Sequence, residues 1–241
     1  MRDLKVRYRQ MALGPLWIIL VPVILMVVFS LVFGGLAKMP SDGLPYPIFT
    51  FAALLPWQFF STGLTRGSSS LVSNIATISK IYFPRMLLPL AAVVASLVDL
   101  LASLLVLACM MAAYGIGPGW HNLALPGFIL LAAATALALS LWLATLSVAF
   151  RDVIIGLPYV LQILMFLSPV VYPSNLVPGM WRFWFRLNPL AQVIDGFRWS
   201  ILGRGQAPDW VTGLSVGLVL ALLWGGAHFF RRTERSIVDL L

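Results

Sequence analysis

The sequence predicts an all-α polytopic membrane protein with six transmembrane helices and both termini in the cytoplasm. Of the 241 residues, 61% are hydrophobic and only 10% are charged, and the mean hydropathy is +0.96. A soluble domain is about 45–50% apolar and about 25% charged. The charges also stand between neutral stretches that are long enough to cross a bilayer as helices, which takes about 20 residues. We therefore attribute the net charge of +8 to membrane topology and not to binding of nucleic acid.

The neutral stretches define the expected elements in chain order. The six expected spans are residues 15–36, 47–64, 86–114, 128–150, 154–171 and 211–230. Pro56 interrupts the second span, and Pro158 and Pro169 lie in the fifth. With the N-terminus in the cytoplasm, most of the sixteen Lys and Arg residues fall in cytoplasmic segments, which is the bias that bacterial membrane proteins show.

The chain opens with the basic run RDLKVRYRQMALGPLW. A helix over this run places Leu4 and Tyr8 on one face and Arg2, Lys5 and Arg9 on the opposite face. This pattern is typical of an amphipathic helix that lies on the cytoplasmic surface of the membrane. A charge cluster that only fixes the topology explains the same run equally well.

A second segment, SSSLVSNIATISKIYFPR, follows the second span. Leu71, Ile75 and Ile78 share one helical face, serines precede them as candidate caps, and Pro84 ends the pattern. We expect a short cytoplasmic helix over residues 70–82 that acts as a docking surface. An ordinary surface helix is the alternative.

The third unusual segment, residues 172–206, is too apolar and too aromatic for a solvated loop. Asn188-Pro189 has the form of an N-cap followed by proline at the first helical position. We expect two short re-entrant helices within residues 177–202. An aromatic belt at the membrane interface is the alternative.

Residues suited to catalysis are sparse. The sequence has no Gly-x-x-x-x-Gly-Lys-Ser/Thr phosphate loop, and His121 and His228 are isolated and are interpreted as structural. We therefore expect no enzyme activity, no metal site and no cofactor in this chain. Asp99, an acid within the third span, is a candidate functional residue, because a charge is costly there. It either pairs with an arginine of a neighbouring helix, or faces a partner subunit or an aqueous path, as in a proton-coupled carrier.

Four segments together resemble a known family: RDLKVRYRQMALGPLW, SNIATISKIYFPRMLLPL, FRDVIIGLPYVLQILMFLSPVVYP and LNPLAQVIDGFR. They resemble the permease subunits of ABC-2 type exporters, and most closely the subgroup that exports lipid-linked polysaccharides such as O-antigen, capsular glycan and teichoic acid. The resemblance implies a homodimer in the inner membrane that works with two copies of a separate ATPase, which binds ATP and Mg²⁺. Family members usually carry a longer segment before the RDLKVRY motif.

The resemblance also implies roles for individual residues. The implied contacts to the ATPase are Arg2, Lys5, Arg9, Asn74, Thr77, Lys80, Tyr82 and Arg85. The implied glycan path and gate are lined by Tyr159, Phe166, Tyr172, Trp181, Trp184 and Phe197. Aromatic rings suit the apolar C–H face of a sugar.

Two other functions remain open from the sequence. The first is an ABC-2 permease for drugs or other small lipophilic molecules, which would have the same fold. The second is a membrane-embedded enzyme acting on lipid-linked sugars, which would need catalytic acids such as Asp99, Asp152 or Asp195.

Overall fold

The computed structural model describes residues 16–75 and 83–240, and this part of the chain folds into helices without a strand. The long elements are α2 (Trp17–Phe29), which continues as the π-helix η2 (Ser30–Leu36), α3 (Tyr46–Ser73), α5 (Leu87–Ala113), α6 (Leu125–Ala149), α7 (Asp152–Phe166) and α10 (Trp210–Leu240). The short elements are η3 (Trp120–Ala124), η4 (Ser174–Leu176), α8 (Gly179–Leu187) and α9 (Pro189–Leu202).

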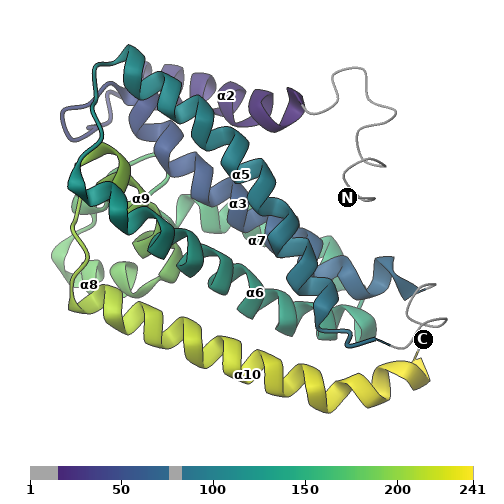
Figure 1. Cartoon of the computed structure of the whole chain (residues 1–241). Helices are drawn as coiled ribbons and strands as arrows, with labels where there is room; N and C mark the ends of the chain where they lie inside the picture. Colours follow the sequence, from purple (N-terminus) through teal and green to yellow (C-terminus); the bar gives the residue numbers. More distant parts are fainter. Residues whose placement is uncertain (1–15, 76–82, 241) are drawn as a thin grey trace.

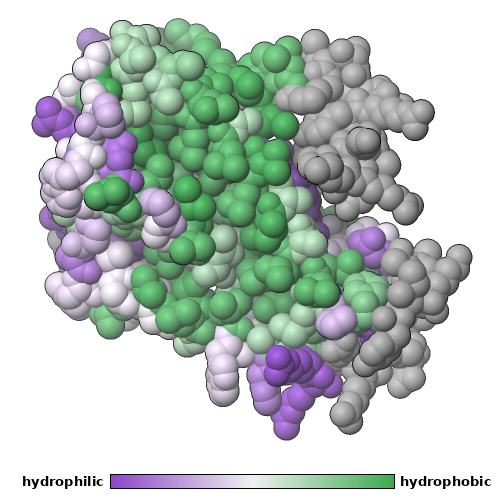
Figure 2. All heavy atoms as spheres, viewed as in Figure 1, coloured by the Kyte–Doolittle hydropathy of each residue, from purple (hydrophilic) through white to green (hydrophobic). Residues whose placement is uncertain are grey.

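The long helices run back and forth between two ends of the molecule (Figure 1). We call one end the α8–α9 end, because α8 and α9 lie there. The connections that follow η2 and α5 lie at the same end. The start of α2, the end of α3, the α6–α7 junction and the end of α10 lie at the opposite end. Figure 2 shows a broad apolar surface between these ends, with hydrophilic residues gathered toward the margins.

Four segments of the described chain are long and apolar enough to cross a membrane: Trp17–Leu36, Leu87–Ala113, Trp120–Ala149 and Trp210–Thr233. The structure therefore confirms a helical protein with several candidate spans. Helix α7 is shorter, with 15 residues. Helix α3 has 28 residues, but its second half carries serines, threonines and Arg66.

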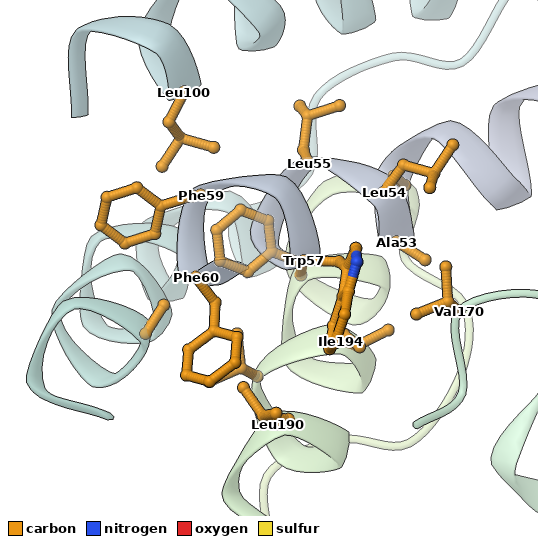
Figure 3. Close-up of a cluster of buried hydrophobic side chains, with 14 of the residues drawn as sticks. Ala53, Leu54, Leu55, Trp57, Phe59, Phe60, Leu100, Val170, Leu190 and Ile194 are labelled. Carbon is orange, nitrogen blue, oxygen red and sulfur yellow. The ribbon is translucent and has the colours of Figure 1, made fainter. Parts of the chain in front are cut away.

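Helix α3 forms the centre of the bundle. Its first half is apolar on every side, which is the pattern of a helix surrounded by others. In Figure 3 its residues Phe59 and Phe60 lie among side chains of α5 and α9, such as Leu100 and Leu190. The helix packs against α5, α6 and α9, so its position determines that of its neighbours.

Small residues let α3 approach α6 closely. Gly63 and Gly67 are buried one turn apart on α3, and Gly67 faces Ser140 of α6. Two turns after Ser140 on α6, the hydroxyl of Ser147 donates to the carbonyl of Ser68, the residue after Gly67, at 2.9 Å. This spacing of two glycines is a common device for packing helices within a membrane.

The structure differs from the sequence prediction where α3 ends. The predicted span stopped at residue 64 and a new helix began at residue 70, but α3 continues to Ser73. Ser68 and Ser70, expected to cap the new helix, instead donate to the carbonyls of Leu64 and Gly67 within α3. Such hydrogen bonds to the preceding turn let serine sit inside a helix. The predicted docking helix otherwise falls mainly on residues 76–82, which lie outside the described residues.

Helix α7 ends at Phe166, before the end of the fifth predicted span at residue 171, and an irregular segment begins at Leu167. Pro158 lies inside α7 and Pro56 inside α3, and neither proline ends its helix. Two short helices, α8 and α9, occupy the segment 177–202. That they re-enter the membrane stays a prediction.

Candidate functional site

A groove of about 490 Å³ lies between α3 and α7. Its lining residues are Trp57, Ser61, Thr62, Thr65 and Arg66 of α3 and Pro158, Leu161, Gln162 and Met165 of α7. Trp57 and Met165 lie toward the α8–α9 end, because α3 starts and α7 finishes there. The groove therefore runs along the length of the bundle and not across it.

The α3 wall of the groove is polar but carries little net charge. Ser61 donates its hydroxyl to the carbonyl of Gln58 at 3.2 Å, and Thr65 donates to the carbonyl of Ser61 at 2.7 Å. Because each hydroxyl proton is used within α3, the lone pairs of these oxygens remain as acceptors. With the exposed amide of Gln162 opposite, the groove can hydrogen-bond a neutral, hydroxyl-bearing molecule.

Arg66 is the cation among these lining residues, and Asp99 of α5, which does not line the groove, compensates its charge. Its Nη2 lies 3.2 Å from Oδ2 of Asp99 on α5, and its Nη1 donates to Ser96 Oγ at 3.5 Å. Asp99 also lines a second cavity of about 350 Å³ between α2, α3 and α5. Of the interpretations open for Asp99, the structure bears out pairing with an arginine of a neighbouring helix.

The polar stripe of α3 was not predicted from the sequence. Gln58, Ser61, Thr62, Thr65 and Arg66 recur at helical spacing, so the signal was present in the sequence. It was overlooked because the predicted span ended at residue 64, which placed part of the stripe in a loop.

Most of the predicted path aromatics are at the surface. Tyr159 and Phe166 of α7 and Trp181 and Trp184 of α8 are exposed, with Trp184 at 66%. Tyr172 is half-buried; its hydroxyl donates to the carbonyl of Phe166 at 2.9 Å and its ring contacts Phe185. Phe197 differs, because it is 0% exposed and packs in the core. The structure therefore does not place Phe197 at the surface.

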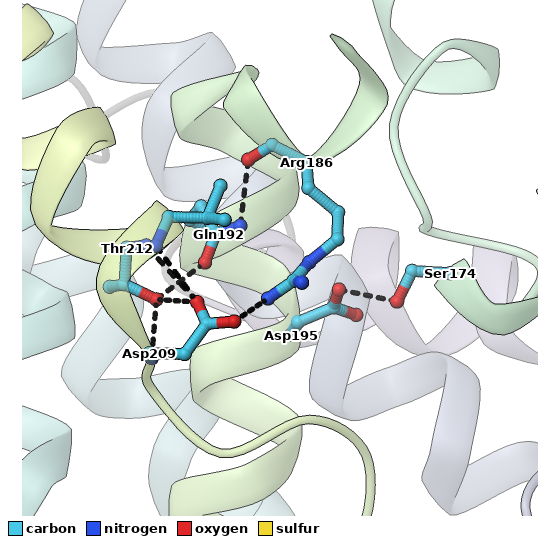
Figure 4. Close-up of polar contacts among 7 residues, drawn as sticks. Ser174, Arg186, Gln192, Asp195, Asp209 and Thr212 are labelled. Carbon is cyan, nitrogen blue, oxygen red and sulfur yellow. Dashed lines mark hydrogen bonds and ion pairs between the residues drawn. The ribbon is translucent and has the colours of Figure 1, made fainter. Parts of the chain in front are cut away.

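Polar contacts join α8, α9 and the start of α10 (Figure 4). Arg186 Nη2 lies 2.7 Å from Asp209 Oδ2, and Gln192 Nε2 donates to the Arg186 carbonyl at 2.7 Å. Thr212 Oγ1 donates to Gln192 Oε1 at 2.7 Å. Burial alone raises the pKa of Asp209, but the hydrogen bonds from Arg186, Thr212 and Val211, together with the charge of Arg186, hold this pKa below its ordinary value.

A second charged group at this end is fully internal. Arg198 of α9 is 2% exposed, and its Nη1 lies 3.9 Å from Oδ1 of Asp195, one turn earlier. Asp195 accepts a hydrogen bond from the hydroxyl of Ser174. Arg198 was not predicted as a functional residue, because apart from Asp195 its partners are the backbone carbonyls of Phe49, Val170 and Tyr172, at least 26 residues away in the sequence.

The predicted ATPase contacts are only partly covered by the structure. Arg2, Lys5, Arg9, Thr77, Lys80 and Tyr82 lie outside the described residues. Asn74 follows the last turn of α3, and Arg85 lies in the turn before α5. Both are at the end of the bundle opposite α8 and α9.

The described histidines have structural partners. His121 Nδ1 lies 2.9 Å from the carbonyl of Ser200, and His228 stacks on Trp224. Among the described residues, no group of three His, Cys, Asp or Glu side chains could hold a metal ion.

Four helical segments long and apolar enough to cross a membrane, in the part of the chain that the structure describes, indicate a multi-pass membrane protein, and one wall of its α3–α7 groove is polar. The family model of the ABC-2 type transporter matches residues 1–202, and the chain belongs to this family. It is 32% identical over 241 residues to the O-antigen export system permease protein RfbA of Myxococcus xanthus, covering 99% of this chain and 92% of that protein. An O-antigen export system permease protein RfbA of Klebsiella pneumoniae is 26% identical over 242 residues, covering 100% and 92%. The polysialic acid transport protein KpsM of Escherichia coli is 21% identical over 250 residues, covering 99% and 93%.

Proposed function

We propose that this chain is the permease subunit of an ATP-driven exporter of lipid-linked polysaccharide, with its ATPase on a separate chain that binds ATP and Mg²⁺. The observation that supports this substrate class is the groove between α3 and α7, whose α3 wall offers neutral hydrogen-bonding groups at the surface of an apolar bundle. Relatives named for O-antigen export and for polysialic acid transport support the same substrate class.

In this proposal α2, α3, α5, α6, α7 and α10 cross the inner membrane, and the α8–α9 end faces outward. Arg85, Arg151, Arg231 and Arg232 then lie on the cytoplasmic side, as the distribution of basic residues in membrane proteins favours. The ATPase binds at this cytoplasmic end, near Asn74 and the predicted contacts within residues 2–9 and 76–82.

Two features of the molecule suit a sugar polymer. In the groove, sugar hydroxyls donate hydrogen bonds to the oxygens of Ser61 and Thr65. Outside the groove lining, exposed rings such as Tyr159 and Trp184 pack on the C–H faces of the sugars. Neutral hydrogen bonds to groups that repeat along α3 hold each sugar weakly. Weak, repeated binding lets a chain move onward, as conduction through a pore requires.

A homodimer follows from the position of the groove. The groove opens at the surface of one subunit, where a polar polymer would meet lipid and leave its hydrogen bonds unsatisfied. A second copy facing α7 closes the groove into a path lined on all sides by protein. Cross-linking between copies at Tyr159→Cys, in a Cys109→Ser background, tests this arrangement; cross-linked dimers support it, and monomers alone reject it.

Export is tested by deleting the gene and measuring surface polysaccharide, then restoring the gene as variants. Thr65→Val with Gln162→Leu removes hydrogen-bonding groups from the groove and should lower export several-fold. Thr135→Val is the matched control, because Thr135 makes the same hydroxyl-to-carbonyl bond on α6, away from the groove. Protein level and co-purification with the ATPase should be normal in the strains that carry the restored gene, the groove variant and the Thr135→Val control.

The outcomes separate the candidate functions. Normal surface polysaccharide in the deletion strain would reject polysaccharide export. Increased drug sensitivity with unchanged polysaccharide would instead indicate a permease for small lipophilic molecules. Equal export by the groove variant and the Thr135→Val control would exclude the groove as the path.

A further inference from the structure

We propose that Arg198 is a positioning residue that fixes the width of the α3–α7 groove at the α8–α9 end. This inference rests on the proposed function, because it assigns that end of the groove as the exit. It concerns the strap, which we define as residues 167–173, between the end of α7 and η4.

Arg198 contacts both α3 and the strap, beyond the α8–α9 end of the groove. On the α3 side, its guanidinium carbon lies 3.7 Å from the ring centroid of Phe49, and its Nε donates to the Phe49 carbonyl at 3.4 Å. On the strap side, Nη2 donates to the carbonyl of Val170 at 2.8 Å and Nη1 to that of Tyr172 at 3.3 Å. One side chain of α9 therefore joins α3 to the strap.

Neighbouring groups complete this connection. The hydroxyl of Tyr46 on α3 donates to the carbonyl of Val171, so three successive strap carbonyls have donors. The strap has no regular secondary structure, and buried carbonyls need such partners. Asp195 compensates the charge of Arg198 and also accepts from Ser174 at the end of the strap.

Arginine suits this position for a geometric reason. Its guanidinium offers five N–H donors in a fixed planar arrangement, and it also stacks on an aromatic ring. A lysine at the same place keeps the charge but presents its donors from one atom. It cannot reach Phe49, Val170 and Tyr172 together, so the connection between α3 and the strap would be lost.

The strap transmits this connection to the groove. It follows directly on Phe166, and the hydroxyl of Tyr172 fastens it to the carbonyl of that residue. Met165, one residue earlier, lines the groove opposite Trp57. Without Arg198, the end of α7 is free to move away from α3. Arg198 thus holds the exit narrow between transport cycles and keeps ATP hydrolysis tied to export.

The test measures access to the groove directly. Met165→Cys, in the Cys109→Ser background, reports access of a charged, membrane-impermeant thiol reagent in the permease–ATPase complex in vesicles. Arg198→Lys should raise the labelling rate about tenfold or more, since a hydrogen bond from a charged donor shifts an opening equilibrium by this order. Export should fall while ATP hydrolysis continues. Arg204→Lys, an exposed arginine nearby, is the matched control and should change neither labelling nor export.

A second variant guards against misfolding. Arg198→Met with Asp195→Leu removes both buried charges together, which proteins tolerate far better than removal of one. It should elute as the wild-type complex does and show the same increase in labelling. Unchanged labelling in the folded variants would overturn the role of Arg198. Increased labelling in variants of a protein that exports no polysaccharide would support Arg198 as the positioning residue and reject the proposed substrate.

Discussion

Replacing Gly67 with alanine should force α3 and α6 apart. A Cβ built on Gly67 would lie 2.7 Å from the Cβ of Ser140, closer than two carbon atoms approach. A Cβ on Gly63, one turn earlier, would lie 3.6 Å from the Cβ of Ala136, an ordinary contact. To reach that spacing at Gly67, the helices must separate by about 1 Å, and overpacking of this kind costs about 1–3 kcal/mol.

The two glycines provide a matched comparison. Glycine to alanine inside a helix gains about 1 kcal/mol from helix propensity at either position. Gly63→Ala should therefore be neutral or slightly stabilising, while Gly67→Ala should be less stable than Gly63→Ala by about 1–3 kcal/mol. The difference between the variants isolates the contact with Ser140, because propensity cancels.

Thermal unfolding of the purified protein in detergent measures this difference. For a chain of this size, about 2–4 °C of midpoint corresponds to each kcal/mol. Ser140→Gly combined with Gly67→Ala removes the opposing Cβ and should recover part of the loss. A midpoint for Gly67→Ala equal to or above that of Gly63→Ala would refute the close approach of α3 and α6.

Three further predictions follow from the charged pairs and the exposed aromatics. Asp99→Asn removes the negative charge that lies 3.2 Å from Arg66 Nη2 and should cost about 2 kcal/mol, below the 3–5 kcal/mol of a fully buried pair because these side chains keep 19% and 28% exposure; the unfolding midpoint measures this cost, and Arg66→Leu with Asp99→Leu should lose less. Trp184→Ala should leave the midpoint unchanged but lower export several-fold, as expected if a sugar stacks on the ring. The pKa of Asp209 is lowered in the folded protein, so the ion pair of Asp209 with Arg186 stabilises α8 fully at pH values above the ordinary pKa of aspartate, about 4. This stabilisation is lost as the pH falls through the lowered pKa of the folded protein. Asp209→Asn should abolish the resulting acid transition in the tryptophan fluorescence.

The sequence predicted those helices best whose apolar residues continue without interruption. Helix α5 and the segment Trp17–Leu36 begin and end within two residues of their predicted spans. A continuous apolar stretch without charge is a local property, so it can be read directly from the sequence. Helix α3 shows where this reading fails. The second half of α3 looks polar in the sequence. The hydrogen bond from Ser147 to the Ser68 carbonyl helps to hold this half against α6, but it joins residues that lie 79 positions apart.

The same distinction applies to the candidate site. Exposure of Trp184 could be anticipated, because aromatic residues in short helices near a membrane surface commonly face outward. The burial of Phe197 could not, because it depends on which face of α9 packs on α3. The role of Arg198 could not be anticipated either, because its acceptor on Phe49 lies 149 residues away in the sequence.

The placement of charge in this molecule has a common logic that bears on transport. The internal arginines Arg66 and Arg198 are each held by an aspartate, Asp99 and Asp195, so both charges are compensated within the bundle. The groove is then left with hydroxyl and amide groups as its main polar contacts. A fixed, uncompensated charge would bind an oppositely charged substrate tightly and stop it. Compensated arginines can instead hold helices in place while the path binds each passing unit weakly, which is what a conduit for a long chain requires.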